Sequence, residues 1–334
     1  MTSFEKNHNS SCQIKLYNLK SVKNNTWAGM VMTTWKQASS WFASTIYDNP
    51  NDGYNWYTFD VDNLVLNTYT NNLKESDIKV KFRDTVNFYQ ILQTKRNKLY
   101  IIYRNPYQRF KSAFYQDFLN RIDNNDFIKE LTGTSTVKEL FKKISLENNI
   151  DESSKEYIRY HKILNSKNSF SLKELNFSIW NEENIKYTKL IIKYILKKHI
   201  DSGKYYRNHN RSYNSYILRF LTNYDFDNVL LVDMDSINLS EIFFNYIDES
   251  KIEESETKVN SWNEPIKKIL DDVVDGYLER EPKDGVMQMD TLSSFIEFMK
   301  TELNIYRTLK THPRNIRQTL AEKPKNIFRG KHTD

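Results

Sequence analysis

Residues 99–115 read LYIIYRNPYQRFKSAFY. The five apolar or aromatic residues that open this stretch predict a buried strand. Asn105 can cap a helix and Pro106 suits the first helical position, so a helix is expected directly after the strand. The apolar positions of that helix repeat at helical spacing and comprise Phe110, Ala113, Phe114 and Phe118. Arg104, at the strand's carboxyl end, and Ser112, two turns into the helix, are well placed to hold a phosphate at a sheet edge.

On either side of this stretch, strands alternate with helices through the first half of the chain, and helices dominate the second half. Strands are predicted over 28–34, 54–61, 78–82, 98–103 and 228–233, and helices over 39–47, 85–94, 106–119, 137–144, 155–164, 185–199, 213–221, 240–247, 266–277 and 291–309. The alternation predicts an α/β fold with a central, mainly parallel sheet and a largely helical middle and C-terminal part.

We expect one domain flanked by polar ends. The predicted organisation is a polar, irregular lead-in over 1–26, a single α/β domain over 27–309 with a helical insertion at about 125–225, and a basic tail over 310–334.

Composition narrows the classes of partner. The chain has 49 Lys and Arg against 43 Asp and Glu, a net charge of +6, which suits an anionic ligand but lacks the concentrated basic face of a nucleic-acid binder. The single cysteine, Cys12, excludes an internal disulfide and a cysteine metal cluster. The sequence shows no apolar run of transmembrane length. We therefore expect a soluble, cytoplasmic protein with no nucleic-acid or membrane partner, and composition leaves the oligomeric state open.

A second anion-binding candidate follows the first predicted strand. Lys36 offers a cation, and Ser39 and Ser40 offer hydroxyls and backbone N–H groups at a helix start. The alternative is that Ser39 only caps the helix and Lys36 is solvated. The two-glycine nucleoside triphosphate pattern is absent, and no clear Mg²⁺-holding Asp accompanies the loop, which argues against an ordinary kinase or NTPase.

Taken together, the two turns resemble a known family. Residues 36–41, KQASSW, resemble the 5′-phosphosulfate loop of sulfotransferases, with Ala38 where that family frequently has glycine. Arg104 followed by Ser112 resembles their 3′-phosphate site, and the run RNPYQRFKSAF looks especially like the carbohydrate-type sulfotransferases. Residues 227–233, DNVLLVD, resemble the family's late strand, which commonly ends in an acidic residue.

The resemblance implies a P-loop-like three-layer fold and the donor 3′-phosphoadenosine 5′-phosphosulfate (PAPS), with no metal. It assigns Lys36 to the bridging oxygen of the phosphosulfate, and Arg104 and Ser112 to the 3′-phosphate. The 5′ end of the donor would be held by Lys36, Gln37, Ala38, Ser39, Ser40 and Trp41. Fixed cations and amides could then stabilise an in-line transfer.

The acceptor hydroxyl needs a base, and the family uses a histidine or a glutamate near the end of a preceding strand. Asp84 occupies that position here and is the first candidate, although an ordinary helix cap is the alternative. Asp60 and Asp62 are further candidates, and His209 lies in a polar, aromatic loop that could line an acceptor site. No pair of histidines has helical metal-ligand spacing, so no metal site is predicted.

The sequence therefore predicts a sulfotransferase that moves a sulfuryl group from PAPS to a hydroxyl, such as one on a carbohydrate. Two alternatives stay open: a P-loop kinase of a small metabolite, and a non-catalytic nucleotide-binding relative.

Overall fold

The computed structural model describes residues 11–47, 56–69, 75–119, 126–165, 182–203, 212–252, 264–278 and 291–317. The chain divides into two compact units. The sheet unit comprises Met1–Pro106, Arg211–Asn260 and Thr301–Asp334, and the helical unit comprises Tyr107–Asn210 and Ser261–Lys300. The helical unit contains most of the insertion predicted at about 125–225, but it begins earlier and takes in a second stretch of chain.

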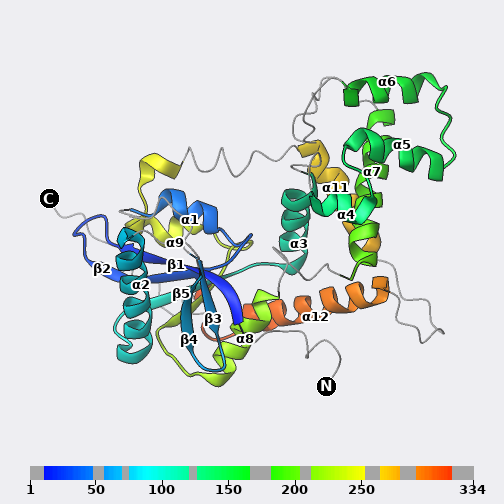
Figure 1. Cartoon of the computed structure of the whole chain (residues 1–334). Helices are drawn as coiled ribbons and strands as arrows, with labels where there is room; N and C mark the ends of the chain where they lie inside the picture. The colour runs from blue at the N-terminus through cyan, green and yellow to red at the C-terminus, as the bar shows by residue number, and fades with distance from the viewer. Residues whose placement is uncertain are drawn as a thin grey trace. The chain divides into compact units, whose positions relative to one another are not determined.

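The sheet unit is built on six strands in the order β4-β3-β1-β2-β5-β6 (Figure 1). Their bounds are β1 Ser11–Lys20, β2 Trp27–Thr33, β3 Trp56–Asp60, β4 Val65–Tyr69, β5 Lys98–Tyr103 and β6 Val229–Asp233. The β2–β5 and β5–β6 pairs are parallel, whereas the β1–β2, β1–β3 and β3–β4 pairs are antiparallel. The α/β class is confirmed, but the prediction of a mainly parallel sheet was wrong, because the sheet is mixed.

The antiparallel half of the sheet arises from two strands that the sequence did not predict. β1 lies inside the expected irregular lead-in, so that expectation was wrong for residues 11–20. Only a short turn joins β1 to β2, and strands joined so closely must run antiparallel. β4 follows β3 through a similarly short turn.

A third difference concerns residues 78–82, predicted as a strand. They belong to helix α2, Glu75–Thr94. The alternation of apolar residues was misleading, because Phe82 is 72% exposed while Phe88, Ile91 and Leu92 form the buried stripe of the helix.

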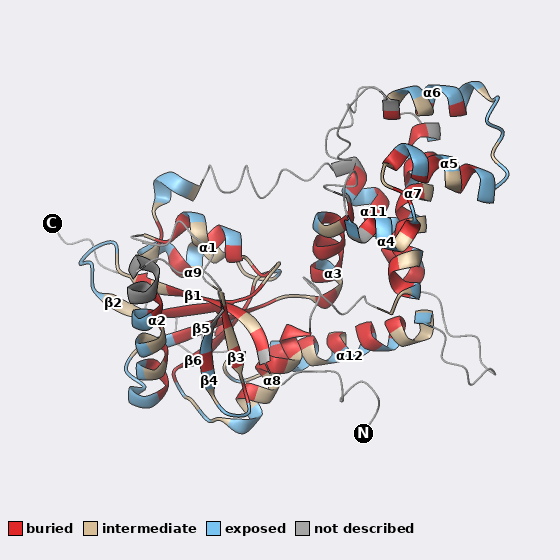
Figure 2. Ribbon diagram, in the orientation of Figure 1, coloured by how far each residue is buried: buried red, intermediate tan, exposed pale blue. Residues whose placement is uncertain are grey.

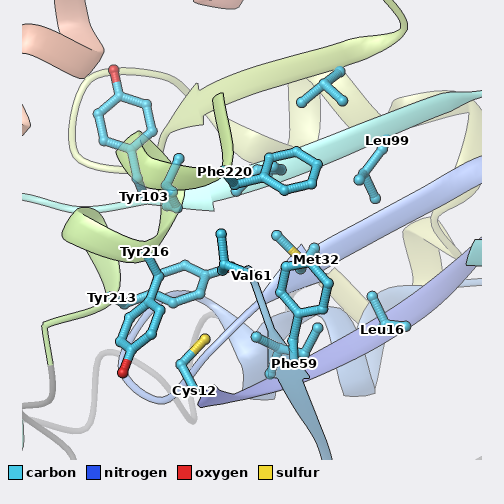
Figure 3. Packing of buried hydrophobic residues seen from close by; sticks show 14 of the residues in the cluster. Cys12, Leu16, Met32, Phe59, Val61, Leu99, Tyr103, Tyr213, Tyr216 and Phe220 are labelled. Carbon is cyan, nitrogen blue, oxygen red and sulfur yellow. The ribbon is translucent and has the colours of Figure 1, made fainter. Parts of the chain in front are cut away.

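Helices cover both faces of the sheet. They are α1 Ser39–Thr45, α2, α8 Tyr213–Asn223, α9 Leu239–Phe243 and the end of α12 Thr291–Thr311, with short 3₁₀ turns η6 Phe244–Tyr246 and η7 Glu249–Lys251. Strand β5 shows the two faces by alternation: Leu99 and Ile101 join a core cluster with α2, α8 and α12, whereas Tyr100 and Ile102 join a second cluster with α1 and α9. Strands β2, β5 and β6 are buried through most of their length, whereas β3 alternates buried and half-buried residues (Figure 2). Figure 3 shows Met32 and Phe220 in the first cluster.

The predicted basic tail starts as ordered structure. α12 continues to Thr311, Asn315 bridges to Leu231 of β6, and Arg314 donates to the carbonyl of Phe226 and pairs with Asp225. Residues 310–317 of the predicted basic tail therefore pack in the sheet unit, and residues 318–334 lie outside the described residues.

The helical unit contains α3 Pro106–Phe114, the π-helical turn η2 Tyr115–Leu119, α4 Asp126–Thr132, α5 Val137–Glu147, α6 Lys155–Asn165, α7 Glu182–Asp201 and α11 Glu264–Leu278, with the first part of α12. Phe110, Phe114 and Phe118 surround His199, with the Phe118 ring centroid at 4.7 Å. Burial lowers the pKa of His199 to about 4, so this imidazole is neutral near pH 7 and does not act as a positive helix end.

Candidate anion site

The loop between β2 and α1 is a tight turn without glycine. Lys36 and Ala38 both adopt left-handed backbone conformations, with φ of 63° and 60°, a geometry that usually costs about 1–2 kcal/mol per residue. Thr33 Oγ1 donates to the carbonyl of Gln37, and the Gln37 N–H donates to the carbonyl of Thr34 at 3.2 Å. Strained backbone of this kind is concentrated at functional sites.

The geometry of this turn shows which helix position Ser39 occupies. The N-cap of α1 is Ala38, and no capping side-chain hydrogen bond is made there by the described residues. Ser39 is the first helical residue, and its carbonyl accepts a 2.6 Å hydrogen bond from Tyr17 Oη. The interpretation of Ser39 as an ordinary cap was therefore wrong. Ser40 is exposed, whereas Trp41 packs in the second core cluster.

The side chain of Gln37 is unusual in its burial and in its hydrogen bonding. It has no exposed surface, and neither its Oε1 nor its Nε2 finds a hydrogen-bond partner among the described residues. Burying an amide without hydrogen-bond partners costs about 1–3 kcal/mol of stability. A polar ligand that forms hydrogen bonds with the Gln37 amide would offset this cost.

Arg104 follows β5 and lies beside this loop. Because β2 and β5 are adjacent and parallel, their carboxyl ends meet at one edge of the sheet. Arg104 Nη1 donates to the carbonyl of Lys36 at 3.1 Å, and Arg104 Nε pairs with Asp235 Oδ1 at 3.1 Å. Asn214 on α8 donates to the carbonyl of Arg104 at 2.9 Å. The structure therefore brings the Lys36 main chain and the Arg104 guanidinium together.

Asp233, the last residue of β6, and Asp235, two residues beyond the strand, complete this edge, and the sequence prediction did not include them in the site. Asp233 has no exposed surface and accepts hydrogen bonds from Tyr306 Oη at 2.9 Å and Ser236 Oγ at 2.6 Å. Asp235 accepts from the N–H of Asn105 at 2.7 Å besides pairing with Arg104. Desolvation raises the pKa of Asp235, while Arg104 acts in the opposite direction. The signal in the sequence was the pair of carboxylates two residues apart, the first of which ends a buried strand.

A lysine on β1 was also missed. Lys15 is buried and pairs across the strands with Thr33, at the start of the loop. Its Nζ lies 4.8 Å from the ring centroid of Trp56, whose own centroid is 4.9 Å from that of Trp35. Burial lowers the pKa of Lys15 to about 8.

Ser112 is not part of this cluster in the sheet unit. It is a buried residue of α3, in the helical unit, next to Lys111, which pairs with Asp271 and Asp275 of α11 at 3.0 Å each. The sheet unit alone therefore supplies Arg104 but not Ser112.

Asp84 does not lie where the base was predicted. It is neither after a strand nor at a helix start, but inside α2, and it has no exposed surface. Tyr57 Oη donates to its Oδ2 at 2.8 Å, and Asn18 Nδ2 donates to its Oδ1. A carboxylate enclosed in this way cannot reach an acceptor hydroxyl, so both interpretations of Asp84, as base and as cap, were wrong.

Asp84 is instead expected to shape the pH dependence of stability. Burial raises its pKa above the ordinary 3.8, against the hydrogen bonds from Tyr57 and Asn18. Because the folded protein then binds this proton more tightly than the unfolded chain, Asp84 makes the free energy of unfolding fall as pH rises through the raised pKa. Asp84→Asn should remove that fall, which urea unfolding of both proteins from about pH 4 to about pH 7 would detect. A pH profile unchanged by the substitution would contradict this account.

The other predicted bases have different outcomes. Asp60 organises the turn after β3 by accepting from the N–H of Asp62 at 3.0 Å and from Asn63 Nδ2 at 2.9 Å. Asp62 pairs with Arg219 on α8 at 2.6 Å. His209 lies outside the described residues.

Two further findings on the described residues concern metal-binding groups and membrane-spanning helices. No group of three or more His, Cys, Asp or Glu within them could hold a metal ion. None of the helices in the described ranges combines the length and the apolar character needed to cross a bilayer.

Comparison with protein-family models, with curated proteins and with solved structures finds no match for this chain. The family resemblance thus rests on the motifs of the sequence alone.

Proposed function

We propose that the protein is a PAPS-dependent sulfotransferase, and that its sheet unit is a P-loop-like domain whose loop around Lys36 and residue Arg104 bind the donor. The observation that carries the proposal is the 3.1 Å hydrogen bond from Arg104 Nη1 to the carbonyl of Lys36. It supports a single site, because two motifs separated by 68 positions in the sequence meet at one edge of the sheet.

In the proposed reaction, an acceptor hydroxyl oxygen forms a bond to sulfur while the bond from sulfur to the bridging oxygen breaks. The proton of the acceptor hydroxyl passes to solvent water, and adenosine 3′,5′-bisphosphate leaves. The ammonium of Lys36 would stabilise the charge that develops on the bridging oxygen. Ser39, Ser40 and the buried amide of Gln37 would offer hydrogen bonds to the 5′ end, and Arg104 would offer its guanidinium to the 3′-phosphate.

Isothermal titration with adenosine 3′,5′-bisphosphate tests the proposal. Arg104→Ala should weaken binding roughly 10- to 100-fold, because a charge-assisted contact to phosphate is lost. The matched control is Arg96→Ala: Arg96 is exposed and precedes β5, at the end of the strand opposite to Arg104. Absence of binding by the wild-type protein and by every variant, or equal binding by the two alanine variants, would contradict the proposal.

The burial of Asp84 favours a second candidate, a nucleotide-binding relative without catalysis, because it removes the first predicted base. Such a protein would bind the bisphosphate but transfer no labelled sulfuryl group from PAPS to any hydroxyl acceptor. A small-metabolite kinase would instead require ATP with Mg²⁺ and would be indifferent to a 3′-phosphate.

A further inference from the structure

Asp235 makes the contacts that an external anion would make at Arg104. Its Oδ1 lies 3.1 Å from Arg104 Nε, and its Oδ2 accepts from the N–H of Asn105 at 2.7 Å. A guanidinium N–H beside a backbone N–H is a common donor set for phosphate and carboxylate groups. One carboxylate thus bridges a cation and a main-chain donor.

The surroundings of Asp235 differ from those of its neighbour Asp233. Asp233 is fully buried and held by Tyr306, Ser236 and the N–H of Asp235. The side chain of Asp235 keeps 22% of its surface exposed, and the Arg104 side chain keeps 19%. Solvent therefore reaches the ion pair, whereas Asp233 is fixed in the core.

We infer that Asp235 is an internal ligand of the anion site at Arg104, which a phosphate monoester must displace in order to bind. The inference rests on the proposed function and adds a regulatory residue to the same site. Displacement exchanges one carboxylate, with a single charge and two oxygens, for a phosphate of charge near −2 with three free oxygens. The exchange favours dianionic phosphates over carboxylates and monoanions, so Asp235 would also contribute to ligand specificity.

The internal contact lowers the apparent affinity, because only the fraction of molecules with Asp235 released can bind. Asp235→Asn keeps the size of the side chain and removes its charge. It should therefore tighten the binding of adenosine 3′,5′-bisphosphate roughly 5- to 20-fold, and leave adenosine 5′-monophosphate, which lacks the 3′-phosphate, nearly unchanged. Asp227→Asn is the matched control, because exposed Asp227 pairs with Lys95 at 3.4 Å just before β6, at the end of the strand opposite to Asp235.

A second measurement separates this inference from the proposed function. Inorganic phosphate is titrated into ¹⁵N-arginine-labelled protein while the Nε–H resonance of Arg104, assigned with Arg104→Lys, is followed by NMR. The resonance should shift at lower phosphate concentration in Asp235→Asn than in the wild-type protein. Asp235→Ser repeats the test in case the asparagine variant unfolds, and circular dichroism checks both variants.

The outcomes are distinct. Binding of the bisphosphate that needs Arg104 but is not tightened in the Asp235 variants would overturn the inference and leave the sulfotransferase proposal standing. An Arg104 resonance that responds to phosphate more readily in the variants, without nucleotide binding by any protein, would support the inference and contradict the sulfotransferase. An Arg104 resonance that phosphate does not move in any of these proteins would also overturn the inference.

Discussion

Replacing Gly29 with alanine is expected to destabilise the sheet unit by about 3–5 kcal/mol. Gly29 lies in β2 with φ of 151°, a conformation that residues with a side chain rarely adopt. A Cβ there would overlap with the carbonyl oxygen of Lys98 and lie 3.0 Å from its amide nitrogen. These are main-chain atoms of the neighbouring strand β5, so no change of rotamer can relieve the overlap.

Gly203→Ala separates this clash from the conformational effect. Gly203 has φ of 64°, and nothing lies within 4 Å of the position of its Cβ among the described residues. The substitution should therefore cost only about 1 kcal/mol. Urea unfolding followed by tryptophan fluorescence suits the Gly29 variant, since four of the six tryptophans, Trp27, Trp35, Trp41 and Trp56, lie in the sheet unit. Circular dichroism follows the helical unit, where Gly203 lies. Equal losses in the free energy of unfolding of the two variants would show that the clash between the new Cβ and β5 does not contribute to the destabilisation.

Strands β2 and β5 belong to the part of the fold that could be predicted from the sequence. Both strands are short apolar runs followed by polar turns, and α1 and α3 follow them directly. Such segments specify their structure locally, through burial, a helix start and the position of Pro106. The same holds for β6 and for the long helices α5 to α8, whose apolar stripes repeat at helical spacing.

Elements that depend on distant partners were not predictable in this way. β1 alternates Ile14 and Leu16 with Lys15 and Tyr17, and both sets are buried because the strand lies in the middle of the sheet. Its mixed composition looks like a solvated segment until β2 and β3 are placed on either side. β4, an edge strand that pairs with β3 through a short turn, was missed as well, and without β1 and β4 the antiparallel half of the sheet was overlooked.

The candidate site also combines residues that local motifs reveal with long-range contacts that such motifs do not reveal. Lys36 and Arg104 could be found from local motifs, because each stands at a strand-to-helix turn. The contact of Arg104 with Asp235 spans 131 positions, and the burial of Asp84 depends on Tyr57 and Asn18 from two different strands. Local patterns do not specify such contacts, so the internal ligand was missed and the base was misplaced.

The largest expected effect on activity concerns Lys36, which is half-buried in the strained turn after β2. If its ammonium stabilises the charge on the bridging oxygen, Lys36→Met should lower the transfer of the labelled sulfuryl group from PAPS to the acceptor about 10²- to 10³-fold. The bisphosphate lacks the sulfuryl group, so its affinity should fall by less than about tenfold. Methionine keeps the length of the side chain, which leaves the charge as the main difference.

Lys23→Met is the control for Lys36→Met, because Lys23 is exposed in the turn that precedes β2, at the opposite end of that strand. It should change neither sulfuryl transfer nor affinity. Transfer would be measured with ³⁵S-labelled PAPS, as labelled sulfate ester with a panel of carbohydrate acceptors and as free sulfate with water, and affinity by titration calorimetry. An equal loss of affinity and of turnover in Lys36→Met would place Lys36 in donor binding alone, since a group that acts only in the transition state lowers turnover without weakening the ground-state complex. Full activity of Lys36→Met would mean that the turn after β2 does not hold the phosphosulfate.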